Sequence, residues 1–341
     1  MLAIVADRWD PDRGGRERYA ADLIAYLRSE GHTVACVPSD RLERAEATRI
    51  LALTPAPCAT HYQLHGGLLA SAFEGERASM ESAVRRALFR PALTLNRRRQ
   101  RLIDDERRLL DGGTALMAFS EATAGELIDG GVDRSRIVVS RPGVDGQRFR
   151  PATAGAARET GSALQLTFVG HNFVLKGLHA AIQTVATLRR GGVDASLTVA
   201  GRGPMRAFHR LADREGVAGH VRFAGALSQH DVAGLHRTSD ALIHPTFYDP
   251  FPRVIVEALA SGCPVITTAC CGAAEILAHG RHGFVVSDPR NVESLADAAS
   301  QLTRSDRRAC MGRAAAELGA SFEHTAHFRE TSRWIFGERG A

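Results

Sequence analysis

Short apolar runs alternate along the chain with segments in which apolar residues recur every three or four positions. The short runs are bounded by glycine, proline or polar residues and predict buried strands. The clearest of them are residues 2–6, 115–119, 137–139, 164–169, 241–244 and 265–268. The intervening segments predict helices with one apolar face, such as the stripe of Tyr19, Leu23 and Leu27 in residues 16–30. This alternation predicts an α/β fold built from strand–helix–strand units.

The length of 341 residues is sufficient for two α/β domains, each with its own core. Residues 151–162 are rich in alanine, glycine and threonine and predict a linker. We therefore expect Rossmann-like domains at residues 1–155 and 156–319 that face each other across a cleft. Residues 291–318 are predicted to be helical.

The composition is that of an ordinary globular protein, with 44% hydrophobic and 24% charged residues. No apolar run reaches the roughly 18 residues of a membrane span. The apolar N-terminal residues lack a basic region and a cleavage site, so they predict a first strand, not a signal peptide. The six cysteines show no metal-ligand spacing. We expect a cytoplasmic protein with reduced thiols and no metal site.

The cationic residues are distributed unevenly between the two residue types. Lys176 is the only lysine among 43 lysine and arginine residues. It follows the predicted strand 164–169 and, with Gly177, opens a helix. Phosphate groups bind at such strand-to-helix junctions in open α/β sheets, and a compact ammonium suits them. The position therefore predicts that Lys176 is a phosphate ligand.

Two carboxylates, Asp249 and Glu257, flank the junction between a proline-rich loop and a helix that opens near Pro252. Glu257 has apolar residues on both sides. It lies either on a solvated helix face, as most carboxylates do, or in a partly buried position where it accepts hydrogen bonds from ligand hydroxyls. The sequence leaves both interpretations open.

Three further features of the N-terminal half are candidate ligand contacts. Gly14 and Gly15 precede the first predicted helix, where backbone N–H groups form either an anion site or an ordinary loop. His65 precedes two glycines that allow a sharp turn, and its imidazole suits proton transfer with a sugar hydroxyl. His61 is the second candidate for this role. A surface loop histidine is the alternative for both.

Arginines and apolar residues interleave in residues 77–108. The arginines are Arg77, Arg85, Arg86, Arg90, Arg97, Arg98, Arg99, Arg101, Arg107 and Arg108. The segment from Arg85 to Arg108 predicts contact with an anionic membrane surface or a phosphorylated acceptor, or else a solvated helix face. We do not expect nucleic-acid binding, because no recognisable binding module is present.

The C-terminal half carries several motifs in a fixed order. Asp249 and Glu257 are separated by seven residues, and Gly262-Cys263-Pro264-Val265 follow the glutamate. Lys176-Gly177 and Gly201-Arg202-Gly203-Pro204 precede them. This arrangement resembles that of retaining glycosyltransferases of the GT-B fold, family four. The chain departs from the family pattern at Asp249, which is usually glutamate. It also lacks an arginine that the family usually has either a few residues before the lysine or directly before it, where this chain has His171 and Leu175.

The resemblance implies two Rossmann-like domains with residues 320–341 crossing back onto the first. It implies that Lys176 holds the donor diphosphate, Glu257 the ribose and Asp249 the donor sugar. The residues implied in donor binding are Gly14, Gly15, Lys176, Gly201, Asp249, Phe251, Pro252, Arg253, Val254 and Glu257. His61 and His65 are implied at the acceptor, and His65, Lys176 and Asp249 in catalysis. Arg141, Arg202 or Arg253 would replace the missing family arginine.

The resemblance implies transfer of a hexose, for which glucose is the first candidate, from a UDP-sugar to a saccharide or glycolipid. It also implies that the reaction requires no metal ion. The bacterial lipopolysaccharide-core glucosyltransferases are the most similar in length and in the basic segment. This implies cell-envelope glycan synthesis, with contact at the inner membrane face. A nucleotide-sugar epimerase and a catalytically silent nucleotide-sugar-binding protein remain as alternatives.

Overall fold

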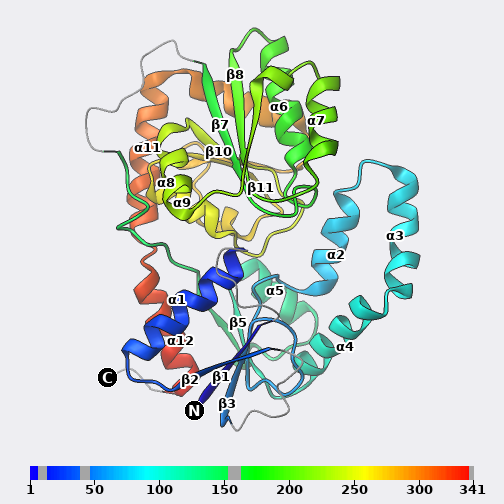
Figure 1. Ribbon diagram of the computed structural model, residues 1–341, viewed down its shortest axis with the longest axis vertical. Helices are drawn as coiled ribbons and strands as arrows, with labels where there is room; N and C mark the ends of the chain where they lie inside the picture. Colours follow the sequence, from blue (N-terminus) through cyan, green and yellow to red (C-terminus); the bar gives the residue numbers. More distant parts are fainter. Residues whose placement is uncertain (7–13, 39–46, 153–162, 338–341) are drawn as a thin grey trace. The chain divides into compact units, whose positions relative to one another are not determined.

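The computed structural model describes residues 1–6, 14–38, 47–152 and 163–337. The chain divides into two compact units, which are described separately. The N-terminal unit comprises Met1–Pro142 and His324–Ala341, and the C-terminal unit comprises Gly143–Glu323 (Figure 1). The sequence suggested boundaries near residues 155 and 320. Residues 143–152 belong to the C-terminal unit because Val144 pairs with Glu323 and donates a 2.7 Å backbone hydrogen bond to Phe322.

A parallel sheet forms the centre of the N-terminal unit, as the strand–helix alternation predicts. Its strand order is β2-β1-β3-β4-β5-β6, and all of the pairs are parallel. The strands are β1 (Leu2–Ala6), β2 (Val34–Pro38), β3 (Arg49–Ala52), β4 (His61–Gln63), β5 (Ala115–Ala118) and β6 (Ile137–Val139). Because every strand runs the same way, their carboxyl ends meet at one edge of this sheet.

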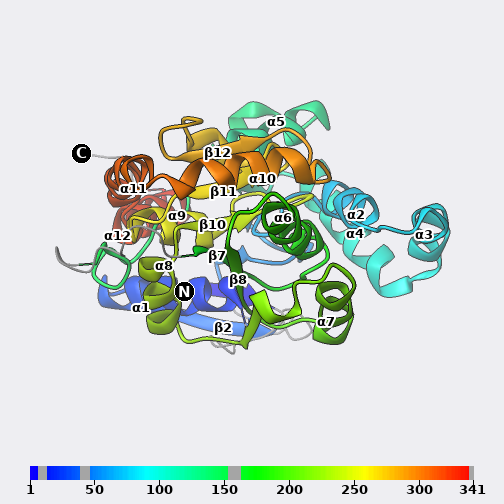
Figure 2. The ribbon, with the colours of Figure 1, turned by 90° about the horizontal axis from the view of Figure 1, so that it is seen from above.

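Helices pack on this sheet and extend beyond it. They are α1 (Gly15–Ser29), α2 (Leu69–Ala78), α3 (Ala83–Leu95), α4 (Arg97–Asp111), α5 (Glu121–Asp129), the short 3-10 helix η2 (Arg134–Arg136) and α12 (His324–Phe336). The C-terminal helix α12 packs against α1, so the expected return of the chain to the first domain is confirmed. Within this unit, α3 is the helix farthest from the sheet, with α2 and α4 between them (Figures 1 and 2).

The C-terminal unit is also built on a parallel sheet, with strand order β12-β11-β10-β7-β8-β9. Its strands are β7 (Leu164–Val169), β8 (Ala195–Ala200), β9 (Val221–Gly225), β10 (Ala241–His244), β11 (Val265–Thr268) and β12 (Gly283–Val286). Its helices are α6 (Leu178–Arg190), α7 (Met205–Arg214), η3 (Ala218–His220), α8 (Gln229–Thr238), α9 (Arg253–Ala260), η4 (Gly272–Ile276), α10 (Val292–Ser300), η5 (Gln301–Thr303) and α11 (Ser305–Ala320).

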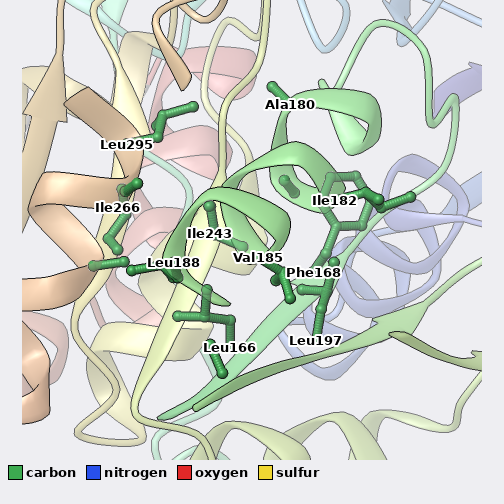
Figure 3. Close-up of a cluster of buried hydrophobic side chains, with 14 of the residues drawn as sticks. Leu166, Phe168, Ala180, Ile182, Val185, Leu188, Leu197, Ile243, Ile266 and Leu295 are labelled. Atoms are coloured by element: carbon green, nitrogen blue, oxygen red, sulfur yellow. The ribbon is translucent and has the colours of Figure 1, made fainter. Parts of the chain in front are cut away.

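A large cluster of buried apolar side chains in the C-terminal unit includes residues of this sheet and of α6 (Figure 3). Leu166 and Phe168 of β7 pack with Ile182 and Val185 of α6, and all four side chains are at most 1% exposed. α10 packs beside α6 (Figure 2).

One predicted helix is divided in the structure. Residues 291–318 form α10 and α11, and η5 separates them. The backbone of Arg304 is extended between the two, and the Arg308 side chain donates to the Leu302 carbonyl that the break exposes. The local hydrogen bonds therefore replace a continuous helix. No helix among the described residues has both the length and the apolar character needed to cross a membrane.

Candidate active site

The loop between β7 and α6 carries Lys176. Phe173 is fully buried against Phe168 and Phe208 and anchors the loop to the core. The Lys176 backbone N–H donates to the Asn172 carbonyl, and Asn172 itself has a φ of 53°. The lysine therefore projects from a tightly closed turn at the carboxyl end of β7, at the junction predicted for phosphate binding.

Gly177 brings this loop against the loop that follows β10. Its φ is +75°, and a Cβ atom there would lie 2.0 Å from the Pro245 carbonyl oxygen. The two loops are also joined by hydrogen bonds, because the Phe247 N–H and the Thr246 hydroxyl both donate to the Leu175 carbonyl. Only glycine allows this contact, so the Lys-Gly pair fixes the position of the lysine relative to β10.

Lys176 and Asp249 form an ion pair at this junction. Lys176 Nζ lies 2.5 Å from Asp249 Oδ2 and 3.3 Å from the Tyr248 carbonyl oxygen. His244, the last residue of β10, places its Nε2 atom 3.4 Å from the same carboxylate oxygen. The side chains of Lys176 and Asp249 are 19% and 9% exposed, so the pair is largely removed from solvent. The structure therefore brings together two of the three predicted catalytic residues.

Burial and charge act in opposite directions on this cluster. Burial favours a raised pKa for Asp249, but the Lys176 ammonium and the His244 hydrogen bond hold the pKa of its carboxyl below its usual value. Burial also lowers the pKa of His244, so that its imidazole is neutral. Burial and then the negative charge of Asp249 raise the pKa of the Cys271 thiol to about 12. The cluster is therefore an ammonium–carboxylate pair with neutral neighbours.

Asp249 also links β10 to the loop after β11. Its carbonyl accepts a 2.7 Å hydrogen bond from the Gly272 N–H, and its own N–H donates to the Cys270 carbonyl. Loops from the carboxyl ends of β7, β10 and β11 therefore converge on this carboxylate. Such convergence is where ligands bind in open α/β sheets.

Helix α9 positions the remaining predicted donor residues. Phe251 and Val254 are buried, as is Pro252, which precedes the helix as its N-cap. Arg253 and Glu257 are four residues apart, so they lie on one face of the helix, and both are half-buried. Glu257 is thus partly buried, as the second interpretation of its position requires, and its ligand stays a prediction.

Gly201 joins the end of β8 to the same edge of the sheet. Its φ is +137°, and a Cβ atom would lie 1.7 Å from the Gly170 carbonyl oxygen. The adjacent Arg202 N–H donates to His171 Nδ1 over 3.2 Å. His171, which occupies a family arginine position, therefore holds the loop after β8 next to the loop of Lys176.

The three candidate replacement arginines have different surroundings. Arg141 belongs to the N-terminal unit, where it lies 4.0 Å from Glu121. Arg202 is exposed and Arg253 is half-buried, and both belong to the unit that contains Lys176. Arg202 and Arg253 are therefore the candidates that share a compact unit with the lysine.

His65 follows the carboxyl end of β4 in the N-terminal unit. Its ring packs edge-on against Tyr19 and Phe119, with ring centroids 4.5 and 4.7 Å apart. Its Nε2 atom lies 3.3 Å from Gln63 Oε1. The histidine is half-buried, so it is held in place by its neighbours and is not a freely solvated loop side chain.

His61 does not accompany His65. It begins β4, at the amino end of the strand, where its Nδ1 atom lies 2.8 Å from the Thr60 hydroxyl and its ring packs on Trp334. Burial and then Arg49 act to lower its pKa. Because the candidate acceptor residues would have to share the carboxyl edge, this placement argues against the acceptor role given to His61.

Gly14 and Gly15 stand at the start of α1, where Gly14 is the N-cap in extended conformation. The loop expected to contain their anion site includes residues 7–13, which lie outside the described residues, as do residues 153–162 of the predicted linker.

His244 is a site residue that the sequence does not predict. The only sign of it in the sequence is a titratable residue at the end of an apolar strand. The spacing of residues along the chain does not reveal that its partner is Asp249.

The chain is similar in sequence to one protein family and to several known proteins. The family model described as glycosyl transferases group 1 matches residues 156–318. The chain is 32% identical over 242 residues to D-inositol 3-phosphate glycosyltransferase 2 of Catenulispora acidiphila, a match that covers 66% of this chain and 56% of that protein. The chain thus spans about half the length of the curated relatives that it matches.

Solved structures share the fold of the whole chain. The crystal structure of WaaG, a glycosyltransferase involved in lipopolysaccharide biosynthesis, matches with a TM-score of 0.82 and 21% identity over 99% of this chain and 100% of that chain. Anabaena HepE in complex with UDP-glucose matches with a TM-score of 0.76 and 17% identity over 99% of each chain. The expected GT-B fold with two Rossmann-like domains is confirmed. The match over residues 156–318 identifies that segment as a glycosyl transferases group 1 domain.

Proposed function

We propose that this protein is a retaining, metal-independent hexosyltransferase that moves glucose from UDP-glucose to a saccharide or glycolipid of the cell envelope. The observation that carries the proposal is the Lys176–Asp249 pair at the carboxyl ends of β7 and β10. The group 1 domain supports sugar transfer as the reaction. The UDP-glucose bound by HepE and the role of WaaG in lipopolysaccharide biosynthesis support the donor and the pathway.

Lys176 would stabilise the leaving diphosphate. An ammonium has three N–H donors, and Asp249 and the Tyr248 carbonyl take two of them. The third would donate to a diphosphate oxygen. Because the lysine is already oriented by Asp249 and its closed loop, it would meet the developing negative charge without rearrangement. The same ammonium would take the charge-neutralising role that a divalent cation has in other transferases.

The carboxylates would orient the donor. Oδ2 of Asp249 contacts Lys176 and His244, so its Oδ1 would accept from a hydroxyl of the donor sugar. Glu257 on the half-buried face of α9 would accept from the ribose hydroxyls. Arg253, one turn earlier on that face, would replace the missing family arginine.

The acceptor would be handled by the N-terminal unit. His65 is proposed to exchange hydrogen bonds or a proton with a hydroxyl of the acceptor or the sugar. Exposed apolar residues of α3, namely Val84, Leu88 and Leu95, lie among arginines of the basic segment. We propose that this surface contacts the inner face of an anionic membrane, where glycolipid acceptors reside.

Replacement of Lys176 tests the proposed reaction. Lys176→Ala is expected to lower the rate of glucosyl transfer by about 10²- to 10³-fold, the usual loss when one oriented electrostatic donor is removed. Transfer from labelled UDP-glucose to isolated envelope lipids measures it. Arg190→Ala, which removes an exposed cation from the far end of α6, is the matched control and should keep full activity. Full activity of Lys176→Ala would refute the diphosphate role.

The same assay separates two other candidate functions. An epimerase would convert the free nucleotide sugar with no acceptor present. A silent binding protein, which the missing family arginine favours, would bind UDP-glucose and turn it over neither with an acceptor nor with water. Acceptor-dependent transfer excludes both.

A further inference from the structure

A continuous chain of hydrogen-bonded side chains leads from His65 into the C-terminal helix α12. In order, its members are His65, Gln63, Tyr19, His327, Ser140 and Glu330. They come from β4 and the residues after it, α1, α12 and the residue that follows β6. All of them belong to the N-terminal unit.

The hydrogen bond at Glu330 determines which group donates and which accepts along this series of side chains. Ser140 Oγ lies 2.5 Å from Glu330 Oε2 and 2.8 Å from His327 Nδ1. An ionised carboxylate only accepts hydrogen bonds, so the single hydroxyl proton of Ser140 is donated to Glu330. His327 must then donate to Ser140 from Nδ1. In a neutral imidazole this leaves the lone pair on Nε2, which lies 2.8 Å from the Tyr19 hydroxyl.

The contacts of Gln63 agree with this direction. Tyr19 donates its proton to His327, so it accepts from Gln63 Nε2 at 3.0 Å. Gln63 Nε2 also lies 3.1 Å from the sulfur of Met117. A thioether has no proton to donate, so the atom that faces it is the amide nitrogen. Gln63 therefore turns its carbonyl oxygen towards His65, and His65 Nε2 is the donor in that contact.

We propose that Gln63 is a positioning residue that holds neutral His65 as the Nε2–H tautomer, with Nδ1 as its basic nitrogen. The use of that nitrogen rests on the proposed function, in which His65 meets a hydroxyl of the acceptor or sugar. Nδ1 would accept the hydroxyl proton, and the ring would be held by Gln63 and by the edge-on contacts with Tyr19 and Phe119.

Burial makes the arrangement persistent. The middle members are nearly inaccessible to water, with exposed fractions of 0% for Gln63, 2% for Tyr19, 4% for His327 and 2% for Ser140. Solvent cannot easily substitute for a member or reverse a bond, and hydrogen bonds in such surroundings reinforce one another. α12 thereby contributes to the choice of tautomer at His65, which is remote from this helix in sequence.

Nitrogen NMR of the wild-type protein tests this directly. Long-range proton–nitrogen spectra of histidine-labelled protein distinguish the two tautomers and the doubly protonated ring. Signals are assigned by their loss in His65→Asn and His327→Asn. The expected result is Nε2–H for His65 and Nδ1–H for His327. Nδ1–H at His65, or a doubly protonated His327 that would donate to Tyr19 and reverse the chain, would overturn the proposal.

The variant Gln63→Leu tests whether Gln63 is the residue that selects the tautomer. His65 should then populate both tautomers, and kcat should fall roughly five- to tenfold, the equivalent of one ordinary hydrogen bond, with KM for UDP-glucose unchanged. Thr331→Val is the matched control, because the Thr331 hydroxyl is fully buried on α12 but is not a member of the hydrogen-bonded series. This variant should change neither the His65 tautomer nor kcat. An unchanged His65 tautomer in Gln63→Leu would contradict the proposal. Absence of transfer by the wild-type protein would instead refute the proposed function. The NMR experiment tests the His65 tautomer whether or not transfer is observed.

Discussion

At the scale of single residues, the candidate site depends on a few positions that the sequence marks by their rarity. Lys176 was predicted as a phosphate ligand because it is the only lysine and stands at a strand-to-helix junction. The structure adds its partner, the carboxylate of Asp249 at 2.5 Å. His244 could not be assigned from the sequence, because its role depends on a contact made across the turn after β10.

The glycine that follows the lysine is expected to be irreplaceable for steric reasons. Gly177→Ala adds a Cβ atom against the Pro245 carbonyl in a left-handed conformation and should destabilise the protein by about 2–5 kcal/mol. Gly192→Ala, at φ +81° with no atom near the added Cβ, is the matched control and should cost about 1 kcal/mol. Urea unfolding measures both. Equal losses would show that the contact with Pro245 carries no constraint.

At the scale of elements, regular structure with a strong period was predicted well and irregular joints were not. The strands at residues 2–6, 137–139, 164–169, 241–244 and 265–268 have the predicted bounds. The break between α10 and α11 was missed, because side-chain hydrogen bonds to exposed carbonyls, such as that of Arg308, leave no periodic signal. The basic segment resolves into α3 and α4.

Glu106 of α4 should make the stability of the α2–α4 region depend on pH. Burial raises the pKa of its carboxyl to about 7, although the Leu69 N–H and the Tyr62 hydroxyl donate to it. The folded state therefore keeps a proton that the unfolded chain, with a pKa of 4.5, releases. The stabilisation is complete below pH 4.5 and is lost as pH rises to about 7, with a total of roughly 3 kcal/mol.

Glu106→Gln should remove this dependence and make the protein more stable than the wild type at pH 8. Urea unfolding from pH 4.5 to 8 measures it. Asp104→Asn, an exposed position on the same helix, should keep the wild-type slope. A wild-type slope in Glu106→Gln would show that another group is responsible.

The exposed stripe on α3 should carry the proposed membrane contact. Val84, Leu88 and Leu95 are 67%, 60% and 83% exposed. Burial of a leucine side chain contributes about 1.5–3 kcal/mol, so Leu88→Asp with Leu95→Asp should weaken binding to vesicles of anionic phospholipid by well over tenfold. Ile128→Asp, which alters an exposed apolar residue on α5, is the control. Co-sedimentation measures it, and unchanged binding of the double variant would exclude α3 as the contact.

At the scale of the whole molecule, the alternation of strands and helices predicted two parallel α/β units, and the fold of solved GT-B proteins confirms that class. The unit boundary depends on the pairing of Val144 with Glu323, a contact between residues far apart in the chain that no local pattern reveals. The hydrogen-bonded chain behind His65 is of the same kind, because it joins β4, α1 and α12.

The central claim is that Lys176 binds the diphosphate of a nucleotide-sugar donor. The most direct test is calorimetric measurement of Kd for UDP and for uridine with the wild-type protein and with Lys176→Ala. Loss of a charged hydrogen bond should weaken UDP binding by about 10- to 100-fold while uridine binding is unchanged. Equal effects on UDP and uridine, or no effect on UDP, would contradict the claim.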